Sequence, residues 1–325
     1  LEETTMNGIL TADIEMAGRM SSVENERYEE FNARGNIGLE NFSYESEDVP
    51  QGVTIAKTEM IVSPQYFELK NFNAQMGKSD ISANGKIHNM LAYMFRDELL
   101  SGEFNFSSGV LDLNEFLTEE EGEGEAAAEE TGEEISVYEV PDNIDFALQT
   151  SIKKLYYDKL DISNIKGMVK IQEGKVVMEN LSMDLLDGSM IMNGSYNTQN
   201  ITKPSVNFGM DINRFDIPQT FEAFNTVKKI APIAEKCTGK LSTDLQFKAI
   251  LQQNMEPDLK TVNGSGSLQT HRIVINNSEI FEKIGQALKS DKYKIINLKD
   301  LSFRYEIVDG NIEIMPFNTQ IGGST

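Results

Sequence analysis

Apolar and polar residues alternate along much of the chain, which is the pattern of β-strands with one apolar and one polar face. The clearest stretch is 241–249, where Leu, Thr, Leu, Phe and Ala alternate with Ser, Asp, Gln and Lys. The same period of two recurs at 206–212, 301–307 and 312–314. The sequence therefore predicts a mainly β protein, interrupted by few helices.

Turn signals and helix signals are both sparse. Asn-Gly and Asp-Gly pairs favour tight hairpins, so we expect consecutive strands to run antiparallel with turns at Asn84-Gly85, Asp187-Gly188, Asn193-Gly194, Asn263-Gly264 and Asp309-Gly310. Three short helices are expected near 90–100, 217–237 and 279–289, as capping pieces on the sheet. Asp216 and Gln219 form a capping-box pattern for the second helix, and Pro232 is expected to kink it or start a new piece.

An acidic run divides the chain. Residues 119–134 read EEEGEGEAAAEETGEE, with too little apolar content to offset the entropy of ordering. We expect a flexible, solvated loop between a β segment at 1–118 and a second one at 135–325. Calcium binding is the weaker interpretation, because the run lacks Asp and Asn ligands at EF-hand spacing.

Charge and composition exclude several classes of protein. The chain has 29 basic and 52 acidic side chains, for a net charge of −23, which argues against binding to nucleic acid or to anionic lipid surfaces through a basic patch. The one cysteine, Cys237, allows no intrachain disulfide and no thiolate zinc site. The longest apolar run, at 90–95, is too short to span a bilayer. The opening LEETTMNG lacks a signal peptide, which suggests a piece of a longer protein.

The sequence contains few residues or motifs that could support catalysis. The two histidines, His88 and His271, are far apart in sequence and in no metal-binding spacing, and neither a nucleophile elbow nor a phosphate loop is present. Gly264 to Ser267 is glycine-rich but is interpreted as a turn. We therefore expect no catalytic residues, no metal and no cofactor. A glycan-active or glycan-binding β protein remains a minor alternative, without any Trp to stack on a sugar.

The apolar strand face is the remaining candidate site. Fifteen methionines and seventeen phenylalanines give it large, soft side chains. If the sheet closes on itself, this face is a core; if it stays open, the face is a long groove for acyl chains. Periodicity alone does not separate the two.

Parts of the sequence repeat. Residues 68–79 (ELKNFNAQMGKS) and 313–324 (EIMPFNTQIGGS) share six of twelve positions, and 181–194 is a weaker third copy. A repeated β unit favours an extended, stacked architecture.

Several stretches in order resemble the C-terminal region of AsmA-like proteins, especially those of Bacteroidetes-type bacteria. They are FDIPQTFEAFNTVKKIAPIAEKCTGKLSTDLQF at 215–247, the G-x-G-x-L strand at 264–268, IFEKIGQAL at 280–288, LSFRYEIVDGNIEIMPFNTQIGGS at 301–324 and, upstream, NMLAYMFRDELLSGEFNFSSGVLDLNEFL at 89–117.

The resemblance implies a long, curled antiparallel β-sheet with an apolar groove, as in the related TamB group and the bridge-like lipid transfer proteins. It implies a role in outer-membrane biogenesis and a periplasmic location, with an inner-membrane anchor in the full-length protein. It supplies no catalytic or metal residues. The groove residues that we expect from the alternating pattern are Phe208, Met210, Leu245, Phe247, Phe303, Tyr305, Ile312 and Ile314.

These observations together favour a non-enzymatic protein that holds or conducts phospholipid acyl chains along an apolar β groove. The second interpretation is an envelope scaffold that binds proteins along its sheet edges. The glycan-binding protein described above is the third.

Overall fold

The computed structural model describes residues 4–19, 21–22, 27, 32–46, 49–63, 65–115, 137–253, 255, 257–276, 283, 286, 295–298 and 301–317. The acidic run at 119–134 and most of the helix expected near 279–289 lie outside these residues.

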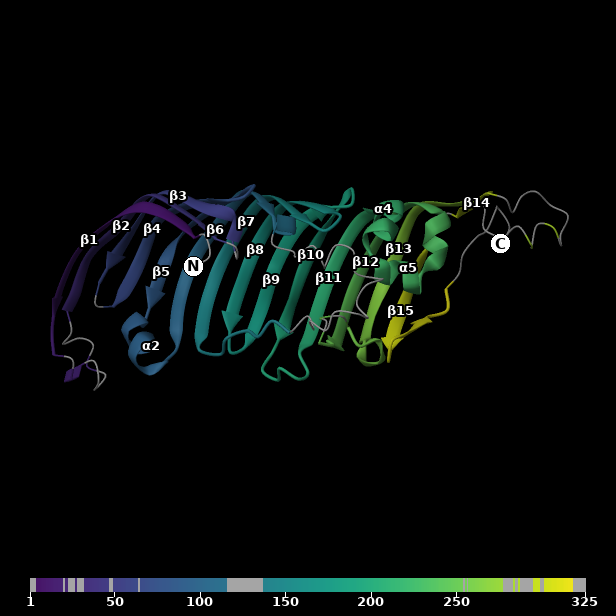
Figure 1. Ribbon diagram of the computed structural model, residues 1–325. Coiled ribbons are helices and arrows are strands. Elements are labelled where there is room, and N and C mark those ends of the chain that lie inside the picture. The colour runs from purple at the N-terminus through teal and green to yellow at the C-terminus, as the bar shows by residue number, and fades with distance from the viewer. Residues whose placement is uncertain are drawn as a thin grey trace.

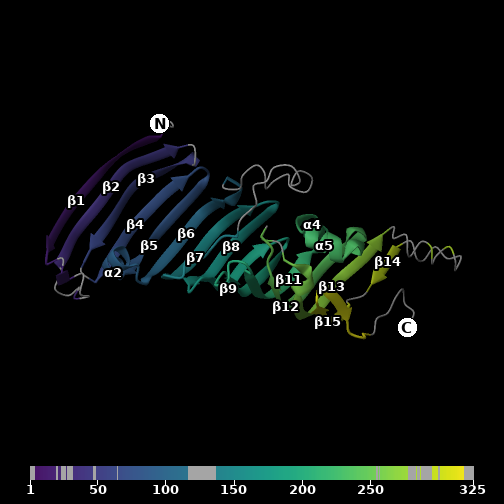
Figure 2. The same ribbon diagram turned by 60° about the horizontal axis from the view of Figure 1, so that its bottom comes forward.

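The chain folds into one curled sheet of sixteen strands that is not closed into a barrel. Fifteen strands follow one another almost in chain order, from β1 to β13 and then β15 and β16, while β14 pairs with β13. The result is an elongated array, with the N-terminal strands at one end and the C-terminal strands at the other (Figures 1 and 2). The expected mainly β, elongated and curled fold is confirmed.

The strands differ in length, and β14 and β16 are the shortest. Their bounds are β1 (Thr5–Ala17), β2 (Asn32–Ser46), β3 (Val49–Val62), β4 (Tyr66–Met76), β5 (Ser79–His88), β6 (Leu100–Asp112), β7 (Ile144–Tyr157), β8 (Leu160–Gln172), β9 (Lys175–Leu185), β10 (Gly188–Asn197), β11 (Ser205–Asp216), β12 (Cys237–Ile250), β13 (Asn263–Asn276), β14 (Ile295–Leu298), β15 (Ser302–Val308) and β16 (Asn311–Ile314).

Neighbouring strands run antiparallel with one exception. β6 and β7 are parallel, with Leu100 opposite Ile144 and Asp112 opposite Tyr156. A parallel pair needs a crossover connection, and the chain between these two strands contains the acidic run. This parallel pairing could not be predicted from the sequence, because the period of two is the same in parallel and antiparallel strands.

The helices are short and sit between strands. α2 (Met90–Arg96) joins β5 to β6, whereas α4 (Ile217–Ala223), α5 (Asn225–Ile230) and the 3-10 helix η3 (Pro232–Lys236) join β11 to β12. Further 3-10 turns are η2 (Leu113–Glu115) and η4 (Leu259–Thr261).

The capping prediction at the second helix holds in part. The Asp216 carboxylate accepts a hydrogen bond from the Gln219 amide at 3.0 Å, as an N-cap should. The Gln219 side chain does not reach back to Asp216 but donates to Asp187, so the capping box is incomplete. Pro232 begins η3, as expected of a new helical piece.

Only two of the five predicted glycine turns exist. Asp187-Gly188 and Asp309-Gly310 lie at hairpins, whereas the other three pairs lie within β5, β10 and β13. Gly264 to Ser267 likewise belongs to β13 and not to a turn. The three pairs inside strands place their glycines next to an aromatic residue of a neighbouring strand, as described below.

The two copies of the repeated stretch occupy equivalent places. The first copy begins in β4, the second strand of the β3–β4 hairpin, and the second copy begins in β16, the second strand of the β15–β16 hairpin. The end of the second copy, from residue 318 onward, lies outside the described residues.

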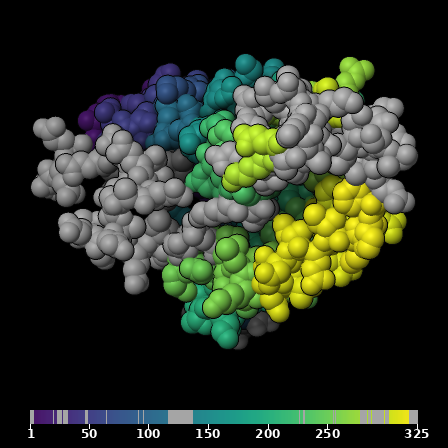
Figure 3. Space-filling view, turned by 90° about the vertical axis from the view of Figure 1, so that its right-hand side faces the viewer, coloured from purple at the N-terminus to yellow at the C-terminus, as the bar shows by residue number. Residues whose placement is uncertain are grey.

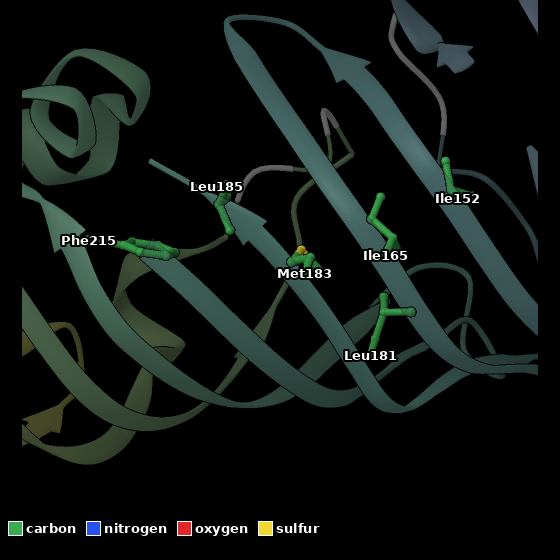
Figure 4. Close-up of a cluster of buried hydrophobic side chains, with 6 residues drawn as sticks. All are labelled: Ile152, Ile165, Leu181, Met183, Leu185 and Phe215. Carbon is green, nitrogen blue, oxygen red and sulfur yellow. The ribbon is translucent and has the colours of Figure 1, made fainter. Parts of the chain in front are cut away.

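Buried hydrophobic side chains form three clusters. The largest joins β7, β8, β9 and β11 and comprises Ile152, Ile165, Leu181, Met183, Leu185 and Phe215, all on one side of the strands (Figure 4). A second cluster packs α4 against β12 and β13 through Ile217, Cys237, Ile273 and Ile275. A third comprises Val206, Ala249 and Leu251.

Candidate functional site

One line of residues crosses the whole sheet without a polar side chain. Directly paired residues of neighbouring strands point to the same face, so the pairing register follows one face from strand to strand. We call the following line the apolar row; in order from β1 to β16 it is Ala12, Ile37, Met60, Leu69, Gly85, Phe104, Leu148, Val169, Met178, Gly194, Phe208, Phe247, Gly264, Ile307 and Ile312.

A second line runs beside it over the first twelve strands. It consists of Ile14, Gly35, Val62, Phe67, Ile87, Gly102, Phe146, Ile171, Val176, Tyr196, Val206 and Ala249. The only polar atom among these side chains is the Tyr196 hydroxyl, which donates to the carbonyl of Tyr138 at 2.8 Å. The two lines make a continuous apolar strip along the long axis of the sheet.

This face lies inside the curl. In a flat single-layer sheet each face is open to water, yet Ile165 and Phe215 keep only 4% and 2% of their surface exposed. The side chains that bury them belong to the same face of neighbouring strands, so the sheet must curl around them. α4 and η3 also pack on this side, against Ile273 and Ile275, which lie on β13. We refer to it as the inner face.

The opposite, outer face is polar. In β12 it carries Asp244, Gln246 and Lys248, all exposed. Ion pairs lie across it, such as Lys170 to Glu179 at 2.7 Å. Two pockets of ≈ 540 and ≈ 500 Å³ are lined mainly by residues of this face. The first, around Lys86 and Asn105, has polar and apolar lining in about equal parts, and the second, around Arg214 and His271, is mostly polar.

All eight residues proposed from the sequence lie on the inner face. Phe208, Phe247 and Ile312 belong to the apolar row. A parallel line of pairs joins Met210 to Leu245, and continues through Gly266 to Tyr305 and Ile314. Phe303 is opposite Leu268, which is in turn opposite Thr243 of β12. The alternation therefore assigned these residues to one surface.

Their exposure varies along that surface. Tyr305 is 8% exposed, whereas Ile312 is 43% and Ile314 55% exposed at the end of the sheet. Phe208 and Phe247 are half-buried against the third cluster, with ring centroids 5.8 Å apart. The inner face is thus partly a core and partly open to water, and the two outcomes that the sequence left unresolved occur side by side.

Tyr305 carries the only hydroxyl of the predicted set. Its oxygen lies 3.0 Å from Thr243 Oγ1, and burial raises the pKa of the phenol above its ordinary value, while the hydrogen bond with Thr243 opposes part of that shift. The hydroxyl therefore stays neutral and satisfied within the apolar face. Its arrangement is structural rather than nucleophilic.

Glycines of the inner face are a feature that the sequence analysis misassigned to turns. A Cβ on Gly194 would overlap the ring of Phe208, and a Cβ on Gly85 would lie 2.6 Å from Cδ1 of Phe104. Gly102 and Gly266 are approached in the same way by the rings of Phe146 and Tyr305, whereas Gly264 is approached by Cα and Cβ of Phe247. The four rings each lie over a neighbouring glycine, an arrangement known to stabilise glycines in sheets. The available signal was a glycine at an inward position of a period-two run.

The middle of the inner face, on β7 and β8, was also missed. Leu148 and Val169 belong to the apolar row, half-buried, and are members of none of the three clusters. The period-two pattern at 144–152 is as clear as in the predicted strands, so the same reasoning would have found Leu148.

The described part of the chain contains no group of side chains arranged for catalysis or for metal binding. No group of three or more His, Cys, Asp or Glu side chains there could hold a metal ion. Ser242 Oγ lies 3.2 Å from His271 Nε2 and accepts a hydrogen bond from the Arg214 amide at 3.0 Å. A nucleophile pair needs a third group that orients the histidine, and among the described residues no carboxylate bonds to His271.

Of the helices described here, none combines the length and the apolar character required for a membrane crossing.

Comparison with known proteins adds no relative: no protein family, no curated protein and no solved structure matches the chain.

Proposed function

We propose that this protein is non-enzymatic and holds phospholipid acyl chains against its inner face. The observation that carries the proposal is the apolar row, which crosses fifteen strands in succession without a polar side chain. A sheet that only needed a local core would not require an apolar residue or glycine at the same level of every strand.

The dimensions suit several acyl chains in a file. Strands lie about 4.8 Å apart, so fourteen strand-to-strand steps extend roughly 65 Å, well beyond one acyl chain. Each methylene removed from water contributes about 0.8 kcal/mol, so even partial coverage of one chain supplies several kcal/mol. The head groups would remain in water at the margins of the curl.

The orientation of the aromatic rings on the inner face supports the same proposal. Because the rings of Phe208 and Phe104 lie over glycines, they extend along the sheet and do not project from it. Projecting rings would interlock with an opposing layer, as in a sandwich core. An apolar surface without projecting rings suits a flexible ligand such as an acyl chain.

Resemblance to AsmA-like proteins supports the cellular part of the proposal. We place the protein in the periplasm, anchored to the inner membrane in its full-length form, with a contribution to outer-membrane biogenesis. Fractionation of cells that express the full-length protein, with and without its N-terminal segment, tests the location independently of lipid binding.

The second candidate function is a scaffold that binds envelope proteins along its sheet edges. The glycan-binding interpretation gains no support from the two described pockets, because Phe104 is the only Phe or Tyr on which a sugar ring could stack in the first and none lines the second. Lipid recovered from purified protein distinguishes the first function from both alternatives.

The direct test combines mass spectrometry of organic extracts with capture of a fluorescent phospholipid. Leu148→Glu places a charge on the apolar row outside the buried clusters, and Gln149→Glu places the same charge on the outer face of the same strand. We expect lipid in the wild-type extract, at least tenfold weaker capture by Leu148→Glu and normal capture by the control.

Leu148→Ser provides the test if the charged variant fails to fold, because it removes apolar area without adding a charge. Equal capture by both folded variants and the wild type would contradict the proposal, as would the absence of lipid binding in the wild-type protein.

A further inference from the structure

The second outer-face pocket lies where β10, β11, β12 and β13 are neighbours in the sheet. Its volume of ≈ 500 Å³ is within the range of small-molecule sites. All four strands contribute polar side chains, which are Ser189, Asp211, Asn213, Arg214, Ser242, Gln269 and His271. The pocket thus combines a guanidinium, a carboxylate, an imidazole and several neutral hydrogen-bonding groups.

A β-bulge in β11 places Arg214 at this pocket. The pairing register shifts there by one residue, so that Asn213 and Arg214 are together opposite Ser242 of β12. The Arg214 amide donates to Ser242 Oγ at 3.0 Å, and the same oxygen lies 3.2 Å from His271 Nε2. Ser242 therefore holds both the bulged backbone and the imidazole. Bulges are frequent next to functional sites, where they re-aim a side chain.

Arginine is an unfavourable residue at the bulged position. Arg214 has a φ of 58°, in the left-handed region that favours glycine and asparagine. Inside the described strands, the other non-glycine residues with positive φ are Asn41, Asn164, Asn180 and Arg272. Three of these four follow the preference for asparagine, and the fourth comes directly after the pocket residue His271. Backbone strain that is retained in this way points to a function of the side chain.

The lysines of the other outer-face pocket have partners, whereas the Arg214 guanidinium does not. Lys70 Nζ lies 2.9 Å from Glu68 Oε1, and Lys86 Nζ lies 4.5 Å from the centroid of the Tyr66 ring. Within the described part of the chain, the guanidinium of Arg214 forms neither a hydrogen bond nor an ion pair, although the chain carries 52 acidic side chains. Its N–H donors are therefore open to a ligand.

We propose that this pocket binds a phosphate ester that carries hydroxyl groups close to the phosphate. A guanidinium is planar and presents two parallel N–H donors to a phosphate, and the Asn213 and Gln269 amides supply further donors. The Asp211 carboxylate repels a bare phosphate but accepts hydrogen bonds from hydroxyl groups. The pocket thus favours a ligand that has both groups.

This chemistry is shared by a free phosphorylated polyol and by a glycerol-bearing phospholipid head group. The pocket opens on the outer face, whereas the acyl chains proposed above lie on the inner face. The inference therefore does not depend on the proposed function.

Isothermal titration calorimetry with glycerol 3-phosphate tests the site on the 325-residue chain. We expect binding by the wild type, and an affinity lower by about tenfold or more for Arg214→Gln, because hydrogen bonds to a charged group contribute strongly. Arg304→Gln is the matched control and should bind normally, since Arg304 is exposed on the outer face of β15 and does not line the pocket. Leu148→Glu should also bind normally, which separates this site from acyl-chain capture.

A second variant distinguishes a ligand-binding arginine from a structural one. Arg214→Asn should lose affinity as Arg214→Gln does, without a lower melting temperature, because asparagine is favoured at a positive φ. A less stable Arg214→Asn protein that binds glycerol 3-phosphate normally would overturn the proposal, because the arginine would then serve the fold alone.

Other ligands identify the source of the phosphate. Binding to phosphatidylglycerol vesicles but not to glycerol 3-phosphate, lost in Arg214→Gln, would support the site and assign the phosphate to a lipid head group. Equal affinity for glycerol 3-phosphate and for the neutral sugar maltose would overturn the proposal in favour of a glycan. Absence of binding to both phosphate ligands would overturn it as well.

Discussion

The two halves of the sheet share one sequence pattern but bury it differently. All three hydrophobic clusters lie in β7 to β13 and the segments around them, where the inner face includes residues such as Phe215 at 2% exposure. In β1 to β6 the same alternation leaves buried residues that belong to none of these clusters, such as Val62 and Leu100, and leaves most β1 side chains in water. Figure 3 views the sheet from its C-terminal end, where β15 and β16 lie in front.

The comparison shows that alternation specifies a face but not how deeply it is buried. Burial depends on local curl and on what packs against the face, such as α4 and η3 over β12 and β13. A half without a consolidated core depends more on backbone pairing between strands, and its apolar residues are available for a ligand or another chain.

The largest expected difference between the halves is the cost of losing one leucine. Leu181, in the first cluster, is 9% exposed, whereas Leu10 is 70% exposed. Leu181→Ala should lower the free energy of unfolding by about 3 kcal/mol, within the range for buried leucines, and Leu10→Ala by less than about 0.5 kcal/mol. Urea denaturation measures both, and similar losses for the two variants would mean that the halves are equally consolidated.

A charge on Phe247 tests the boundary between core and groove. Phe247 is half-buried, so Phe247→Asp should cost about 2 kcal/mol, less than a substitution deep in a core, because the carboxylate still reaches water. We expect a folded protein with a lower melting temperature and weaker lipid capture. Gln246→Asp, on the outer face of the same strand, is the control and should change neither. Complete unfolding of Phe247→Asp would assign this position to the core.

Much of this fold could be predicted from the sequence, because strand faces follow directly from alternation. The strands around 206–212, 241–249 and 301–307 and the Asp216 cap lie where the pattern indicated. The eight candidate residues share a face for the same reason.

What the sequence could not supply depends on contacts between distant segments. The parallel β6–β7 pair depends on which edge of the sheet β7 joins and in which direction it runs, and the local pattern does not encode that choice. The glycines at 85, 194 and 264 were misassigned because an Asn-Gly pair favours a turn locally. In the sheet, the ring of a neighbouring strand lies over Gly85 and Gly194, and the backbone and Cβ of Phe247 lie close to Gly264. The division of the inner face into core and groove depends on curl.

Glycine substitutions should affect both halves alike, which sharpens the contrast with leucine. A Cβ on Gly194 would overlap the Phe208 ring and lie 2.7 Å from the carbonyl oxygen of Asn207. Gly194→Ala should therefore cost about 2 kcal/mol, and Gly85→Ala in the N-terminal half should cost a similar amount. At Gly209 the nearest atoms are 3.9 Å away, so Gly209→Ala is the neutral control. A loss confined to one half would show that only that half is tightly packed between strands.

The smallest effect concerns Tyr305, at the margin of the clustered half. Tyr305→Phe removes the hydrogen bond to Thr243 and should cost about 1 kcal/mol at neutral pH. Burial raises the phenol pKa above its ordinary value of 10.0, so the folded state favours the neutral phenol. This contribution is complete below pH 10.0 and is lost as the pH rises through the folded-state pKa, because the unfolded chain ionises first. From pH 8 to 11, the free energy of unfolding obtained from denaturation curves should therefore fall less steeply with pH for Tyr305→Phe than for the wild type. Identical slopes would mean that the hydroxyl is open to water.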